Sequence, residues 1–508
     1  MKLPTLKITY PVRTISNRVF FLLLLFLVKN VDAQVYYFDV DHQDIHKAYQ
    51  LAEQLKLDQA RAFCDELKIS QPGNLMVYHV ENYIDFYHCF ISEEDRVYKQ
   101  VEPNKELRLT QLTKGDENSP YFRFSQAEVI LQWALVDLKF KNYLSALINI
   151  NKATNLLEEN KIAFPEFILN DKSLSVIHAV VGTIPDSYKK PLSWVSSFEG
   201  TIAQGYSEIS AMTCDIDESD LFYKEVYVIK ALIEMHLVDD KQAAWSTASN
   251  SLLDKKATPL MKFVLANVAH RSNNNDIAIS ILSKEQKAEK NQLSFYYLDF
   301  LHGAYRLNNL EETADQYLLN YVKNFKGKNY IKESYLKLAW FEYAVNNDKD
   351  AFFKYLELCK VHGESITDED KYASRVAQKA ILPNRGFLRA RLLFDGGYFE
   401  RAMDELNKIE ASVKPEEVAE FQYRKSRILF EQRKYNEALV GLYAIINRSE
   451  KNEDFHITSL YYIALTYERA ENLELATSFY KRVLSEKSGA YKSSLHQKAK
   501  AGLLRLSN

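Results

Sequence analysis

The chain has 508 residues, too many for one compact core, and 47% of them are hydrophobic. Glycine (14 residues) and proline (11 residues) are scarce, which disfavours sheets and disordered linkers and favours helices. The formal net charge is −3, and no run of Lys or Arg resembles a nucleic-acid-binding patch. The composition therefore predicts an ordered, all-α protein with no DNA or RNA partner.

Residues 1–33 have the features of an export signal. A basic region free of acidic residues precedes ten consecutive apolar residues, Val19–Val28. Ten helical residues span about 15 Å, half of the hydrocarbon core of a bilayer. Val31 and Ala33 occupy the positions that a signal peptidase reads, and no cysteine follows that could carry a lipid anchor. We predict cleavage after Ala33 and export to the periplasm or envelope of a bacterium; retention of the apolar run as an anchor is the alternative.

A small residue followed twelve positions later by alanine recurs along the rest of the chain. Such a pair is typical of a helical hairpin, because two helices that cross closely leave room only for small side chains. Asn- and Gly-rich breaks, such as Asn273–Asn275 and Asp395–Gly397, lie where the turns between the helices are expected. The nine predicted pairs are Ala48/Ala60, Ala134/Ala146, Ala231/Ala243, Ala266/Ala278, His302/Ala314, Ala339/Ala351, Ala390/Ala402, Ser426/Ala438 and Ala464/Ala476.

From Ala243 onward the second alanines advance by 35, 36, 37, 51, 36 and 38 residues. The period of the tetratricopeptide repeat is about 34 residues, so these repeats resemble that family with lengthened turns. The resemblance implies a tetratricopeptide-like α-solenoid of antiparallel helix pairs, and the alternative is a helical bundle without repeats. The step of 51 residues predicts an extra stretch around Lys360–Lys371.

The segment 157–215 does not fit the repeat frame, that is, the recurring pair of a small residue and an alanine twelve positions later. It gathers three of the prolines and three of the glycines around apolar runs, which predicts two short helices joined at Pro185 and packed on the repeats. We therefore divide the chain into a signal peptide (1–33), an N-terminal helical region with this insert (34–220) and a repeat array (221–508). Residues 174–205 could also make a peripheral contact with a membrane.

Two short segments resemble a eukaryotic tetratricopeptide family that includes the inclusion-clearance proteins of the mitochondrial outer membrane and lipid droplets. Ile184-Pro185 stands where that family has Leu-Pro, and Phe198-Glu199-Gly200 stands where it has a Gly-Phe-x-Gly-type turn. The C-terminal run Tyr491–His496 also looks like the ending of that family. The export signal departs from the family, so a shared cellular role does not follow.

The sequence contains no phosphate-binding loop, nucleophile elbow or His-Glu-x-x-His motif, so we predict a non-catalytic protein without a cofactor. The four cysteines, Cys64, Cys89, Cys214 and Cys359, lack Cys-x-x-Cys spacing, and we read them as buried small side chains. His42 and His46 would share a helical face, but no third metal ligand is evident.

A helical array offers a concave face lined by the first helix of each hairpin. Aromatic and Arg side chains, which are enriched at the centres of protein interfaces, occupy the corresponding positions of the last repeats. The alternative is that these rings are core residues. The predicted partner-binding residues are Trp340, Tyr343, Phe387, Arg391, Phe394, Tyr423, Arg427, Phe430 and Tyr461.

These features together predict an exported scaffold that binds a protein or peptide partner. The Lys/Asn set of carboxylate-clamp repeats is absent, so a C-terminal carboxylate peptide does not follow as its ligand. Two alternatives stay open: a carbohydrate-binding component that offers Tyr and Trp rings to sugars, and an enzyme whose acidic residues are distant in sequence.

The order of basic, apolar and small residues generates a direct prediction about export. Mass spectrometry of the mature protein should find Gln34, free or cyclised, at the N-terminus. A mature protein that retains Val19–Val28 would contradict cleavage and favour the membrane anchor.

Overall fold

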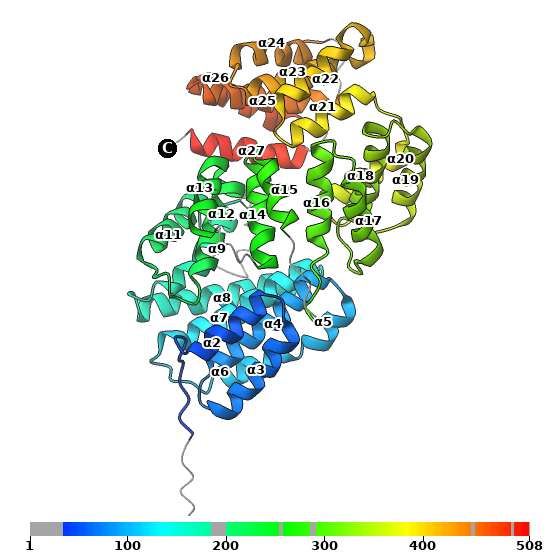
Figure 1. The fold of residues 1–508 in the computed structure, drawn as a ribbon. Helices are drawn as coiled ribbons and strands as arrows, with labels where there is room; N and C mark the ends of the chain where they lie inside the picture. The colour runs from blue at the N-terminus through cyan, green and yellow to red at the C-terminus, as the bar shows by residue number, and fades with distance from the viewer. Residues whose placement is uncertain are drawn as a thin grey trace, which may run out of the picture.

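The computed structural model describes residues 34–183, 200–252, 258–284, 291–448, 453–488 and 492–506. Apart from one isolated bridge between Tyr37 and Asn74, the regular structure in these ranges is helical (Figure 1). The all-α class is therefore confirmed. Among the helices described, none is long and apolar enough to cross a membrane. The predicted signal peptide lies outside the described residues.

The N-terminal region is built on a long hairpin, α7–α8, with α4 packed between it and the hairpin α2–α3. One continuous apolar core runs from Val40 through this region to Ile233. The helices of this region are α2 (Gln43–Glu53), α3 (Leu57–Ser70), α4 (Met76–Ser92), α5 (Asp95–Val101), α6 (Asn104–Leu112), α7 (Pro120–Lys139) and α8 (Tyr143–Ala163).

The segment outside the repeat frame forms helices α9 (Leu169–Thr183) and α11 (Ile202–Asp215), which pack on each other. Gly205 allows this close approach, because a Cβ there would lie 2.2 Å from the carbonyl oxygen of Ser175. Most apolar side chains of α9 are buried, whereas Val180 is exposed. Pro185 and the Phe198-Glu199-Gly200 turn lie outside the described residues, and membrane contact by 174–205 stays a prediction.

The rest of the chain is a succession of antiparallel helix pairs, each packed on the next, as expected for a tetratricopeptide-like α-solenoid. The helix α27 packs on α25 and α26 as a C-terminal cap. The helices are α12 (Tyr223–Ile233), α13 (Lys241–Leu252), α14 (Pro259–Arg271), α15 (Asn275–Ser283), α16 (Tyr297–Asn308), α17 (Ala314–Asn324), α18 (Ile331–Ala344), α19 (Lys349–Val361), α20 (Asp368–Lys379), α21 (Arg385–Asp395), α22 (Phe399–Ile409), α23 (Val418–Glu431), α24 (Tyr435–Ile446), α25 (Glu453–Arg469), α26 (Leu473–Ser485) and α27 (Lys492–Arg505).

Seven of the nine predicted hairpins have the same type of turn between their two helices. A residue with positive φ ends the first helix, and the amide of the next residue donates to the carbonyl five residues earlier, which is a Schellman-type closure. In these seven hairpins both predicted small positions are buried, as expected for a close crossing. The left-handed residues are Leu55, Lys141, Asn273, Leu310, Gly397, Arg433 and Glu471.

The other two hairpins correct the predicted frame by one residue. In them the closing amide, of Asp240 or Asp348, donates to the carbonyl six residues earlier, so the turn holds one extra residue. In the first case a π-helical turn, Glu234–Val238, accommodates it. The buried partner of Ala231 is therefore Ala244 and not Ala243, and the buried partner of Ala339 is Phe352 and not Ala351.

The extra stretch predicted by the 51-residue step is helix α20, which packs on α18 and α19. Its first turn is tied to the preceding repeat because Asp370 accepts the backbone amides of Tyr330 (2.8 Å) and Glu333 (3.1 Å). The next helix, α21, contacts α16 as well as α18. The array therefore changes direction after α20 and returns toward its own earlier repeats (Figure 1).

Turns that are far apart in sequence touch in the folded array. The Leu293 amide donates to the Leu55 carbonyl at 2.8 Å, which ties the α2–α3 turn to the array. Further along, Tyr398 donates to Asp276 at 2.5 Å. Gly397 is required there, because its φ is +79° and a Cβ would lie 2.9 Å from the Cβ of Asn273. The superhelix is therefore wound closely enough to make contacts between its successive turns.

The corrected frame predicts which alanines lie at helix crossings. Ala402→Leu and Ala244→Leu should each overpack a crossing and lower the free energy of unfolding by about 1–3 kcal/mol. Ala243→Leu, at a partly exposed position one residue away, should cost much less. Chemical denaturation of the three variants provides the comparison. Equal losses in Ala243→Leu and Ala244→Leu would show that the extra turn residue does not shift the frame.

Candidate functional site

The nine predicted partner-binding residues lie on the first helices of successive hairpins, α18, α21, α23 and α25. The structure buries four of them: Trp340 and Tyr343 are 7% exposed, Tyr461 is 4% exposed and Phe387 is 2% exposed. These four rings pack in the hydrophobic clusters between helices. The remaining five, which are partly exposed, are Arg391, Phe394, Tyr423, Arg427 and Phe430.

Arg391 connects α21 to the helices before it. Its guanidinium lies 4.6 Å from the ring centroid of Trp340 and 5.2 Å from that of Tyr372, whose hydroxyl it donates to at 2.7 Å. The carboxylate of Asp395, one helical turn away, lies 3.8 Å from Nε. The charge of Arg391 is therefore largely satisfied within the chain.

Arg427 occupies the equivalent position one repeat later and is held by three rings. Its guanidinium carbon lies 3.9 Å from the ring centroid of Tyr462, 4.8 Å from that of Phe394 and 5.7 Å from that of Tyr423. One NH group donates to the Tyr423 hydroxyl at 2.8 Å, whereas the buried Nε has no acceptor. Arginine over aromatic faces is attractive, but the rings supply no negative charge to balance it.

Each of these two arginines therefore contacts an aromatic side chain of the preceding first helix: Trp340 in one case and Phe394 in the other. The repeat frame predicted that these arginines and rings share one face, but not these contacts, and it missed two of the rings. Tyr372 lies on the inserted helix α20, outside any repeat. Tyr462 is adjacent to the predicted Tyr461, and its ring faces Arg427.

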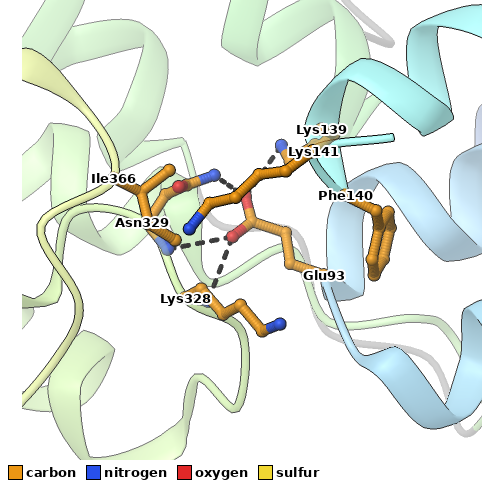
Figure 2. A pocket seen from close by; sticks show the side chains of 7 residues that line it. All are labelled: Glu93, Lys139, Phe140, Lys141, Lys328, Asn329 and Ile366. Carbon is orange, nitrogen blue, oxygen red and sulfur yellow. Dashed lines mark hydrogen bonds and ion pairs between the residues drawn. The ribbon is translucent and has the colours of Figure 1, made fainter. Parts of the chain in front are cut away.

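A second notable cluster lies where the N-terminal region meets the array, around the carboxylate of Glu93. Glu93 ends helix α4 in a left-handed conformation and is 7% exposed. It accepts the backbone amides of Lys328 (3.1 Å) and Asn329 (3.0 Å), and its other oxygen accepts the Asn329 side-chain amide and pairs with Lys139 at 2.7 Å. Figure 2 shows this carboxylate pointing from α4 toward the α17–α18 loop.

The cavity beside Glu93 has a volume of about 20 Å³, which suffices for about one water molecule. Two further lysines line it, and both are paired: Lys141 with Glu364 at 3.5 Å and Lys328 with Asp95 at 2.8 Å. Because the charges balance and the space is small, this cluster is a joint between two parts of the protein and not a ligand site.

A third cluster is a buried ion network that joins α7, α9 and α12. The ammonium of Lys172 contacts Glu128 at 2.6 Å and Glu225 at 2.7 Å, and the Lys172 side chain is 2% exposed. The hydroxyl of Tyr49 donates to Glu225, and burial lowers the pKa of nearby His79 to about 3, so this imidazole stays neutral. The paired groups hold the insert helix α9 in place.

Within the described ranges, no group of three or more His, Cys, Asp and Glu side chains could hold a metal ion. His42 accepts the amide of Asp44 at the start of α2, where it acts as a helix cap. Of the four cysteines, Cys64, Cys89 and Cys359 are buried, as the sequence predicted, whereas Cys214 is exposed.

No protein-family model matches this chain, and no curated protein matches it. Among solved structures it is similar to the crystal structure of the APC/C hetero-tetramer Cut9–Hcn1, with 11% sequence identity and a TM-score of 0.27 over 90% of this chain and 89% of that chain. A likeness at this level transfers neither a partner nor a function, and the fold rests on the helix packing described above.

The joint at Glu93 can be tested directly. Glu93→Gln removes the charge and one acceptor while the four donors around the carboxylate remain, so the variant should lose about 1–3 kcal/mol of stability. The amides of Lys328 and Asn329 should also exchange hydrogen faster. Glu94→Gln is the matched control, since its partner Arg96 is 84% exposed and such a pair contributes little. Unchanged hydrogen exchange at both amides in Glu93→Gln would show that Glu93 does not hold the loop at Lys328 and Asn329 in place.

Proposed function

We propose that this protein is a non-catalytic, exported scaffold that holds a protein or peptide partner on the inner face of its last repeats. The carrying observation is that Arg391 and Arg427, 36 residues apart, each contact a ring of the preceding repeat. A regular succession of guanidinium and aromatic groups suits an extended polar segment, to which the planar guanidinium donates several hydrogen bonds. Export rests on the N-terminal basic and apolar segments.

The partial exposure of the inner-face rings favours a protein partner over a sugar. Three of the largest rings predicted for this face, those of Trp340, Phe387 and Tyr461, are buried between helices. Arg427 contacts the accessible rings of Phe394 and Tyr423. A sugar-binding platform would need an uncovered aromatic face, whereas a peptide can use the exposed edges and the arginines together.

Site-specific photocrosslinking tests this proposal. A benzophenone amino acid in place of Phe394 or Phe430 should give a crosslinked partner in envelope preparations. The same group in place of Val440, which is 73% exposed on the second helix of its hairpin, or of Ile162, which is 84% exposed, should give none. Adducts that form only at Val440 or Ile162 would place the partner on the outer face and refute the proposal.

A further inference from the structure

One histidine of the N-terminal region, His79 in the first turn of α4, is buried without a hydrogen-bond partner for its ring. The residue is 1% exposed, and neither ring nitrogen has a partner within the described part of the chain. Three aromatic rings surround the imidazole, with centroids at 5.4 Å (Tyr83 of α4), 5.7 Å (Phe222, the N-cap residue of α12) and 6.1 Å (Phe124 of α7). His79 therefore lies where α4, α7 and the start of α12 meet.

Two histidines of the repeat array are buried in a different way, because each keeps a polar partner. The Nδ1–H group of His270 donates to the side-chain carbonyl of Asn275 at 2.8 Å. The Nε2 atom of His302 accepts from the Nε–H group of Arg306 at 2.9 Å. His79 has neither a donor nor an acceptor beside its ring, so nothing around it is arranged to hold an imidazolium.

The nearest charged groups form the buried ion network described above, and they offer no place for a second cation. The ammonium of Lys172 lies 4.7 Å from the ring centroid of Phe222, the same ring that covers His79. The two carboxylates of the network, Glu128 and Glu225, are already in contact with Lys172, at 2.6 and 2.7 Å. A proton on His79 would thus put a second positive charge beside the same aromatic ring, at a high desolvation cost.

The other titratable groups on the surrounding elements do not change this balance. Burial raises the pKa of three phenols, so they stay neutral: Tyr49, Tyr83 and Tyr87. The carboxylates on the other faces of α4 are paired, Glu81 with Lys68 and Asp85 with Arg61 and Arg108. Asp220, which precedes α12, accepts the amide of Phe222 at 2.7 Å. Each acid near His79 therefore already has a partner of its own.

We propose that His79 is an acid switch in the N-terminal core, because its ring can take up a proton only when α4 separates from α7 and α12. Acid therefore favours an opened form of this region. The same separation breaks the contacts of Lys172, which hold the insert helix α9 against α7 and α12. This inference is independent of the proposed function.

The pH range follows from the sign of the shift. Burial, followed by the positive charge of Lys172, lowers the pKa of His79 to about 3, against the opposing effects of Glu225 and the Ser125 backbone. In the opened form the imidazole has an ordinary pKa of about 6.5. The closed core is therefore fully stable above about pH 6.5, and its opening constant should rise by about thirtyfold from pH 7.5 to pH 5.

Hydrogen exchange followed by mass spectrometry, corrected for the intrinsic exchange rate at each pH, tests the proposal on the mature protein. The opening constant of the α4 amides should rise by at least about tenfold from pH 7.5 to pH 5 in wild type. His79→Leu, a neutral side chain of similar volume, should reduce this rise to less than about threefold. His88→Leu, at a partly exposed position near the other end of α4, should keep most of the rise.

His79→Phe provides a second neutral side chain if His79→Leu does not fold. An equal rise in wild type and in the His79 variants, or no rise in wild type, would overturn the proposal. So would a rise at α18 that also disappears in His79→Leu, since it would show that the whole protein unfolds. On wild type alone, an NMR titration of the His79 ring near pH 6.5 with the α4 amides still protected would show that the closed core accepts the proton.

Discussion

The fold depends on one backbone hydrogen bond that closes each helical hairpin. An amide just after a left-handed residue donates to the carbonyl five residues earlier, and this bond sets the number of residues between the two helices. That number decides which side chains meet where the helices cross. In most hairpins both are small, whereas Phe352 lies opposite Ala339. Where the loop gains one residue, at Asp240 and Asp348, the crossing shifts by one residue on the second helix and the hairpin is otherwise preserved.

Periodicity in the sequence was sufficient to predict the hairpins, because the small residues found at close helix crossings recur at a nearly constant interval. It could not detect the extra residue before Asp240, since a π-helical turn changes the spacing without changing the composition. Contacts between distant turns, such as Glu93 with Asn329, also have no local signal. They arise where parts of the chain that are far apart in sequence meet in the folded array.

The candidate site, too, could be predicted from the sequence only in part. The frame predicted that Arg391 and Arg427 would occupy equivalent positions in successive repeats, and it did not predict their contacts with Trp340 and Phe394 of the preceding first helices. Whether Trp340 and Phe387 would be core residues or exposed rings stayed open, because burial depends on the helices that pack over them; the structure buries both. Lys498 lies in the capping helix, outside the frame, so only the structure places its ammonium over the ring of Tyr461.

The contacts between distant turns fix the number of repeats. In an open solenoid each repeat touches only its neighbours, so evolution can duplicate or delete one repeat at little cost. Here Gly397 lies against Asn273, and Glu93 binds the loop at Lys328–Asn329. A duplicated hairpin between two such partners would move one of them along the superhelix by a whole repeat and break the contact between them. The lineage of this chain should therefore vary in loop length and surface residues while the count of hairpins stays constant.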